Sequence, residues 1–133
     1  MTTSNAPLPQ NSHVISLDQA KEMTATYRGN KEIILAPEFQ DKDILPLSET
    51  FNRAAFDQLL STPGCAGIRI YYGMGEGLKI HAIAVAVNEA NEDILPDPAV
   101  QGIAGESSDE PVIIEEGQRC PPICPEKKSL LNS

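Results

Sequence analysis

The sequence contains no tryptophan, and only 5% of its 133 residues are aromatic. This scarcity limits stacking platforms and large aromatic pockets. Basic residues are also few: 10 lysines and arginines stand against 19 acidic residues, which gives a net charge of −9. Nucleic acids and anionic membranes carry the same sign of charge as this chain, so we expect neither as a partner.

Long hydrophobic runs are missing as well. No apolar stretch approaches the roughly 20 residues that a membrane-spanning helix needs. The opening residues 1–7, MTTSNAP, lack the basic start and apolar stretch of a secretory signal. We therefore expect a soluble, cytoplasmic protein with room for one domain.

Proline, glycine and acidic residues divide the chain into three parts. Residues 1–13 are polar, contain two prolines and show no apolar period, which indicates a flexible N-terminal arm. Residues 97–133 are rich in proline, and the stretch between Lys79 and Arg119 has nine acidic residues but no basic one. Charge repulsion favours an extended C-terminal arm there. This leaves residues 14–96 as the core domain, a size that oligomerisation often helps to stabilise.

Two helices are predicted from their N-terminal caps. Ser16 and Gln19 have the spacing of a capping box, and an apolar stripe follows over residues 17–28. Asn52 is a good cap for a second helix over residues 53–60.

A β-hairpin gives the strongest strand signal. Residues 67–72 alternate apolar and polar, glycines occupy the turn, and the chain returns through residues 78–87. Because the return strand is apolar on both faces beyond Ala82, we expect it to lie centrally. Residues 112–114 could add a strand, pairing locally or with a neighbouring molecule. The predicted fold is α+β: short helices packed on a small antiparallel sheet with a central β-hairpin, and extended arms at both ends.

The hairpin suggests one candidate binding site. Aligned strands would place four side chains on one sheet face: Arg69, Tyr71, Lys79 and His81. Such a patch could bind a small anion or a nucleotide, with the Arg69 guanidinium as bidentate donor. It could equally be an ordinary solvent-facing sheet surface. A third alternative is that the patch receives the acidic segment 106–116 of the same or a neighbouring chain.

The three cysteines offer several chemistries. Cys120 and Cys124 lie four positions apart with two prolines between them, and Cys65 is distant in sequence. The three could join His81 or His13 in a Cys3His zinc set, although the paired spacing of structural zinc sites is missing. A reversible Cys120–Cys124 disulfide is another alternative. We favour reduced cysteines packed against the domain or a partner, and we expect no cofactor.

Three stretches together carry a resemblance: residues 43–52, residues 64–73 and residues 120–125. In that order they resemble a group of small bacterial proteins with no assigned function. The resemblance implies a bacterial cytoplasmic protein, and no catalytic residue is carried over from it.

No pattern of catalytic residues stands out, because neither histidine has a serine or cysteine nearby in a nucleophile motif. Our leading hypothesis is a non-enzymatic structural or interaction protein that self-associates into a homo-oligomer through its arms and the hairpin edge. A different protein partner is also compatible with this hypothesis. The rival hypothesis is the anion- or nucleotide-binding domain, and a weaker one is a thiol or zinc module.

Overall fold

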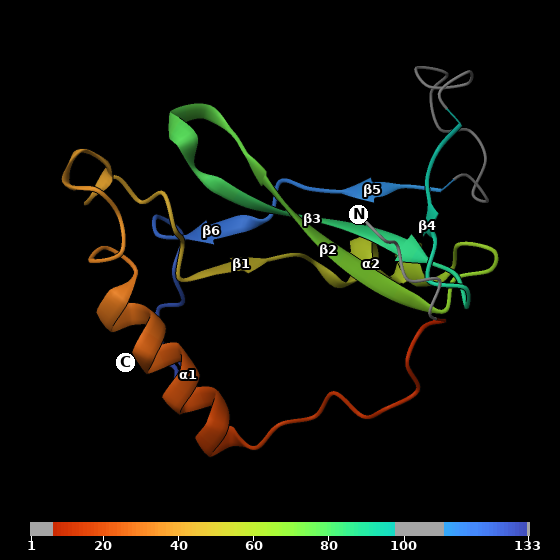
Figure 1. Ribbon diagram of the computed structural model, residues 1–133, viewed down its shortest axis with the longest axis horizontal. Coiled ribbons are helices and arrows are strands. Elements are labelled where there is room, and N and C mark those ends of the chain that lie inside the picture. Colours follow the sequence, from red (N-terminus) through yellow and green to blue (C-terminus); the bar gives the residue numbers. More distant parts are fainter. Residues whose placement is uncertain (1–6, 98–110, 133) are drawn as a thin grey trace. The chain divides into compact units, whose positions relative to one another are not determined.

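The computed structural model of the protein describes residues 7–97 and 111–132 (Figure 1). The described chain has two α-helices and two antiparallel sheets, so the predicted α+β class is confirmed. It divides into two compact units. Unit 1 comprises the described parts of residues 1–10, 51–73 and 82–116, and unit 2 comprises residues 11–50, 74–81 and 117–133 without the last residue.

The main sheet belongs largely to unit 1. Its order is β2 (Gly67–Met74), β3 (Ile80–Val87) and β4 (Asp93–Ile94), and β5 (Ile113–Ile114) also pairs with β3. Val87 of β3 is opposite Asp93 of β4, and Val85 is opposite Ile113 of β5. The predicted hairpin and the central position of its return strand are therefore confirmed. The proposed strand at residues 112–114 forms as β5 and pairs within the same chain.

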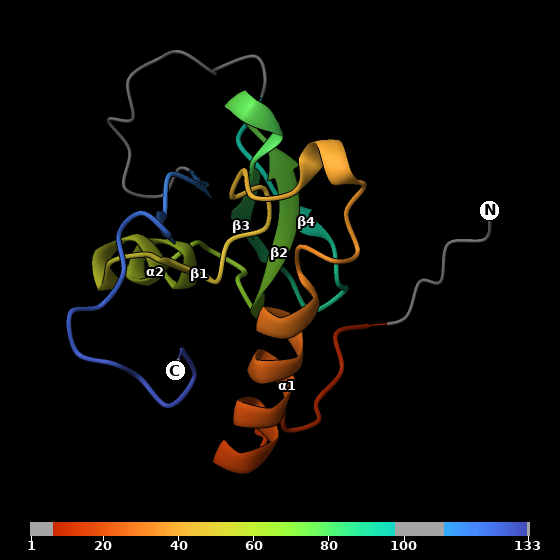
Figure 2. The same cartoon turned by 90° about the vertical axis from the view of Figure 1, so that its left-hand side faces the viewer.

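The core of unit 1 lies where α2 (Arg53–Leu60) meets this sheet. α2 begins as predicted, because the Asn52 side chain accepts a hydrogen bond from the Ala55 N–H at 2.9 Å. The helix lies to one side of the sheet and contacts β5 (Figures 1 and 2). Its Leu59 is completely buried, as are residues 84–87 of β3.

Part of the N-terminal arm also packs on unit 1. The Leu8 N–H donates to the Glu89 carbonyl at 3.1 Å. Gly67 makes room for the Leu8 side chain, since a β-carbon on this glycine would lie 3.0 Å from one Leu8 methyl. Residues 1–6 of the arm lie outside the described residues.

Unit 2 contains α1 (Leu17–Asn30), the 3-10 turns η1 (Pro37–Phe39) and η2 (Glu76–Leu78), and the two-stranded sheet of β1 (Ser48–Thr50) and β6 (Gln118–Cys120). The predicted capping box forms at α1: the Gln19 N–H donates to Ser16 Oγ at 3.0 Å, and the Ser16 N–H donates to Gln19 Oε1 at 3.1 Å. No residue of α1 is buried, however, so its apolar stripe does not contribute to a core.

A buried arginine holds unit 2 together. Arg119 of β6 is only 7% exposed, and its guanidinium donates to three backbone carbonyls. The Nε atom bonds the Ile80 carbonyl at 3.1 Å, and Nη2 bonds the carbonyls of Asp43 and Ile44 at 2.7 and 3.1 Å. Thus β6, the start of β3 and the segment before β1 share one side chain as their common donor.

The segment expected to be an extended C-terminal arm contributes β5 and β6. Residues 98–110, which include positions 106–110 of the acidic segment 106–116, lie outside the described residues. Among the helices that are described, none is long and apolar enough to cross a membrane.

Candidate functional site

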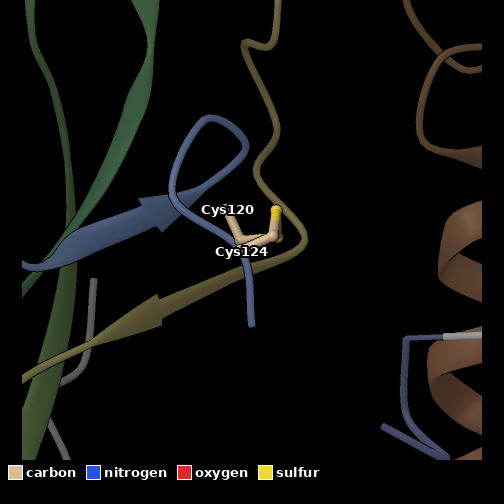
Figure 3. Close-up of a disulfide and its surroundings, with 2 residues drawn as sticks. All are labelled: Cys120 and Cys124. Atoms are coloured by element: carbon tan, nitrogen blue, oxygen red, sulfur yellow. A yellow bond between two sulfur atoms is a disulfide. The ribbon is translucent and has the colours of Figure 1, made fainter. Parts of the chain in front are cut away.

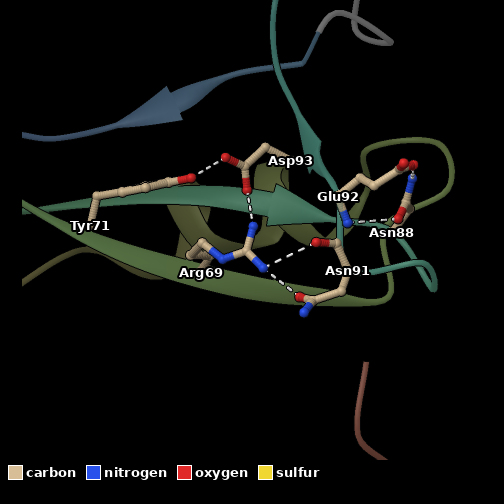
Figure 4. Close-up of polar contacts among 6 residues, drawn as sticks. All are labelled: Arg69, Tyr71, Asn88, Asn91, Glu92 and Asp93. Atoms are coloured by element: carbon tan, nitrogen blue, oxygen red, sulfur yellow. Dashed lines mark hydrogen bonds and ion pairs between the residues drawn. The ribbon is translucent and has the colours of Figure 1, made fainter. Parts of the chain in front are cut away.

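Arg69 and Tyr71 occupy alternate positions on β2, and both side chains turn toward the start of β4 (Figure 4). Arg69 Nη1 donates to Asp93 Oδ1, and the Tyr71 hydroxyl donates to Asp93 Oδ2. One carboxylate therefore binds both residues. All three belong to unit 1.

Asn91 completes this cluster. Arg69 Nη2 donates to the Asn91 carbonyl at 3.1 Å and also to its side-chain Oδ1. The turn that presents Asn91 is itself closed, because the Glu92 N–H donates to Asn88 Oδ1 at 3.0 Å and the Asn91 N–H to the Asn88 carbonyl at 2.9 Å. Asn91 has a φ of +67°, a left-handed conformation that asparagine tolerates better than most residues. We call Arg69, Tyr71, Asn91 and Asp93 the β2–β4 cluster.

Within the β2–β4 cluster, Asp93 raises the pKa of both side chains that donate to it. The hydrogen bond to Asp93 raises the pKa of the Arg69 guanidinium, which keeps that group charged. The same carboxylate accepts a hydrogen bond from the Tyr71 hydroxyl and raises the pKa of Tyr71 above its ordinary value of 10.0. Ionised Tyr71 would lose this bond and would face a like charge.

These contacts bear directly on the anion-binding hypothesis. A free anion at Arg69 would have to displace a carboxylate of the same chain that already forms a salt bridge with it. The acid that neutralises Arg69 comes from β4, whereas the sequence suggested segment 106–116. The arrangement indicates that Arg69 links β2 to β4 and to the turn before it through hydrogen bonds within the chain.

Replacing Asp93 with asparagine is expected to lower the pKa of Tyr71, because the carboxylate that holds the phenol proton is removed. The raised pKa also makes the stability of the folded protein depend on pH. A folded pKa above the unfolded value stabilises the wild-type protein fully below about pH 10, and this contribution is lost as pH rises through the folded pKa. Ultraviolet titration of tyrosinate absorbance measures the shift. Glu92→Gln removes a neighbouring charge outside the cluster and should leave the Tyr71 titration in place; equal shifts in both variants would contradict the assignment.

Lys79 and His81, the other two predicted site residues, are grouped with unit 2. The Lys79 carbonyl accepts a hydrogen bond from the Gly75 N–H at 2.9 Å, which closes the turn around η2. The His81 imidazole packs against Gly75, where a β-carbon would lie 3.1 Å from Nε2. The structure thus joins Arg69 and Tyr71 through Asp93, while Lys79 and His81 are associated with the η2 turn.

The cysteines differ from the favoured expectation. Cys120 and Cys124 form a disulfide, so the prediction that they are reduced is wrong (Figure 3). The reason is the turn after β6: the Ile123 N–H donates to the Arg119 carbonyl at 2.9 Å, and the two Cα atoms come within 4.7 Å of each other. That separation lies in the range that disulfides require.

The disulfide occupies two of the three sulfurs that the zinc hypothesis used. The third, Cys65, is a free thiol in unit 1, and its Sγ lies 3.3 Å from the Gly67 carbonyl. Within residues 7–97 and 111–132, no group of three or more His, Cys, Asp or Glu side chains could hold a metal ion. His13 lies on the segment before α1 and is exposed.

Sequence reasoning missed Asp93, Asn91 and Arg119. Asp93 and Asn91 follow Arg69 by more than 20 residues, so no local pattern joins them to it. Because β4 has only two residues and pairs with β3, no local pattern in the sequence marked Asp93 as the partner of Arg69. The Arg119 hydrogen bonds go to backbone carbonyls, which no side-chain pattern in the sequence marks.

Comparisons of this chain with protein-family models, with curated proteins and with solved structures find no match.

Proposed function

We propose that the protein is a structural or interaction protein that self-associates through the outer edge of β2. The observation that carries this proposal is that β2 is an eight-residue strand at the end of the sheet order, with no strand paired to its outer side in the described part of the chain. An edge strand presents unpaired N–H and C=O groups to any second strand that approaches.

β2 also lacks the features that normally protect an edge. Its sequence, GIRIYYGM, contains no proline and no lysine, and Arg69 is its only charged residue. That charge is compensated by Asp93 within the chain. The strand therefore brings no uncompensated charge to a contact, although the chain as a whole is acidic.

Exposed apolar side chains line the same strand. Ile70, Tyr72 and Met74 occupy alternate positions and are all exposed, and Tyr72 is exposed to 78%. Successive side chains on a strand alternate between faces, so these three share one face. Burying them would contribute about 25 cal/mol for each Å² of apolar surface removed from water.

A second copy of the chain is the occupant that β2 fits best. Antiparallel pairing of two identical strands is self-complementary about a two-fold axis. In a register centred on Tyr71, Tyr72 of one copy would lie opposite Ile70 of the other. Aromatic and β-branched residues are a favourable cross-strand pair.

Tyr72→Lys tests this proposal. The variant places a lysine on the edge in both copies, so we expect the dissociation constant of the assembly to rise by about tenfold or more. Light scattering after size-exclusion chromatography, over a range of protein concentrations, measures this change. Circular dichroism should be unaltered, because the substituted side chain is exposed.

Val14→Lys is the matched control. Val14 is 87% exposed and lies in unit 2, away from the β2 sequence, so the same charge change there should leave assembly unaltered. A wild-type protein that stays monomeric at the highest concentration would overturn the proposal. So would dissociation by Val14→Lys together with no effect of Tyr72→Lys.

A further inference from the structure

The Cys120–Cys124 disulfide borders a hollow in unit 2. The hollow has a volume of about 140 Å³, and its lining includes both cysteines, Leu47, Pro125, Lys127 and Lys128. This is room for the reactive end of a small molecule. The disulfide is therefore in contact with solvent-accessible space and is not enclosed in a core.

The two cysteines differ in exposure. Cys120 is the last residue of β6 and is buried at 2% exposure, and its carbonyl accepts a hydrogen bond from the Leu47 N–H at 2.7 Å. Cys124 lies on the loop after β6 and is exposed. Figure 3 shows this loop bringing Cys124 back alongside Cys120. In thiol–disulfide exchange, access decides which sulfur is attacked, and here access favours Cys124.

The charge around the hollow is positive although the chain is acidic. Lys127 and Lys128 both line it and both are exposed. From Cys120 to Asn132 these two lysines stand against a single acid, Glu126, for a local net charge of +1. Such a site attracts anionic molecules more than the rest of the surface does.

We propose that Cys120–Cys124 is a reactive disulfide that undergoes exchange with small thiols bearing carboxylate groups, with Cys124 Sγ as the atom attacked. This site is separate from the β2 edge, and the proposal does not depend on self-association.

The exchange balances in two steps. An incoming thiolate forms a bond to Cys124 Sγ, the S–S bond to Cys120 breaks, and Cys120 leaves as a thiolate that takes a proton from water. A second thiolate then attacks the small-molecule sulfur of the mixed disulfide and releases Cys124 as a thiolate. The protein gains two electrons, and two small thiols are oxidised to their disulfide.

The test uses the full oxidised chain and two probe thiols. Glutathione carries two carboxylates and one ammonium group, whereas cysteamine carries only an ammonium group. Rapid alkylation followed by mass spectrometry of the tryptic peptide 120–127 locates the probe. We expect glutathione on Cys124 and the alkyl group on Cys120.

Charge removal provides the second readout. Lys127→Gln with Lys128→Gln should slow the glutathione reaction about three-fold or more at low salt and leave the cysteamine reaction as fast or faster. Lys21→Gln with Lys42→Gln makes the same net change at exposed sites elsewhere in unit 2. An equal loss in this control would overturn the role of the hollow. Glutathione found mainly on Cys120, or cysteamine slowed as much as glutathione, would also overturn the proposal.

Discussion

Leu59→Ala is expected to lower the free energy of unfolding by about 2–5 kcal/mol. Leu59 is the fully buried residue of α2, and the helix contacts β5 on the sheet whose central strand supplies buried residues 84–87. Removing its terminal carbons loses apolar burial and leaves a cavity that the rigid strand can fill only in part. Because the chain has no tryptophan, urea unfolding followed by far-ultraviolet circular dichroism is the suitable measurement.

The neighbouring residue supplies the control. Leu60 is 57% exposed, so Leu60→Ala should cost no more than about 1 kcal/mol. The two variants make the same chemical change at adjacent positions of one short helix, so helix propensity affects both alike. If Leu60→Ala destabilised the protein as much as Leu59→Ala, the burial of α2 against the sheet would be contradicted.

The starts of both helices could be predicted because each depends on a few adjacent residues. Ser16 with Gln19, and Asn52 with Ala55, form their capping bonds within four residues of sequence. The packing of these helices did not follow from the same signals. α1 has an apolar stripe like that of a core helix, yet it buries no residue, because a stripe shows which side is apolar and not what covers it.

The hairpin was predictable for a related reason. Alternation along β2 and the doubly apolar end of β3 extend over several residues, long enough to show a period and to place β3 centrally. β1, β4 and β6 have only two or three residues each, which is too short to show any period. Their pairing depends on contacts distant in sequence, such as Ser48 with Cys120.

The candidate site shows the same division. The sequence placed Arg69 and Tyr71 on one face of β2, because strand alternation is local. It did not show that both side chains would donate to Asp93, because that contact depends on where β4 joins β3. For the cysteines, spacing alone left a disulfide and free thiols open, and the turn closed by Ile123 decides between them.

Arg119→Ala is expected to destabilise unit 2 by about 2–4 kcal/mol, because removal of a buried donor leaves its acceptors without compensation. The carbonyls of Asp43, Ile44 and Ile80 would lose the guanidinium, although the Ile44 carbonyl keeps the Ile80 N–H as a donor at 2.9 Å. Urea unfolding measures the loss in free energy. Hydrogen exchange with mass spectrometry should show reduced protection in residues 43–50 and 118–123, which the arginine links.

Two further substitutions separate hydrogen bonding from packing. Arg119→Met keeps the apolar stem but has no donors, so its free energy of unfolding should be close to that of Arg119→Ala if the carbonyl bonds dominate. Arg119→Lys keeps the charge without the planar guanidinium, so it should recover only part of the lost free energy. Arg53→Ala is the control, since Arg53 is 92% exposed in its 3.3 Å ion pair with Asp57 and should cost less than about 0.5 kcal/mol. If Arg119→Met were as stable as the wild type, the role of Arg119 would lie in its hydrocarbon stem. If Arg119→Ala kept wild-type protection from hydrogen exchange, Arg119 would not link the segments of unit 2.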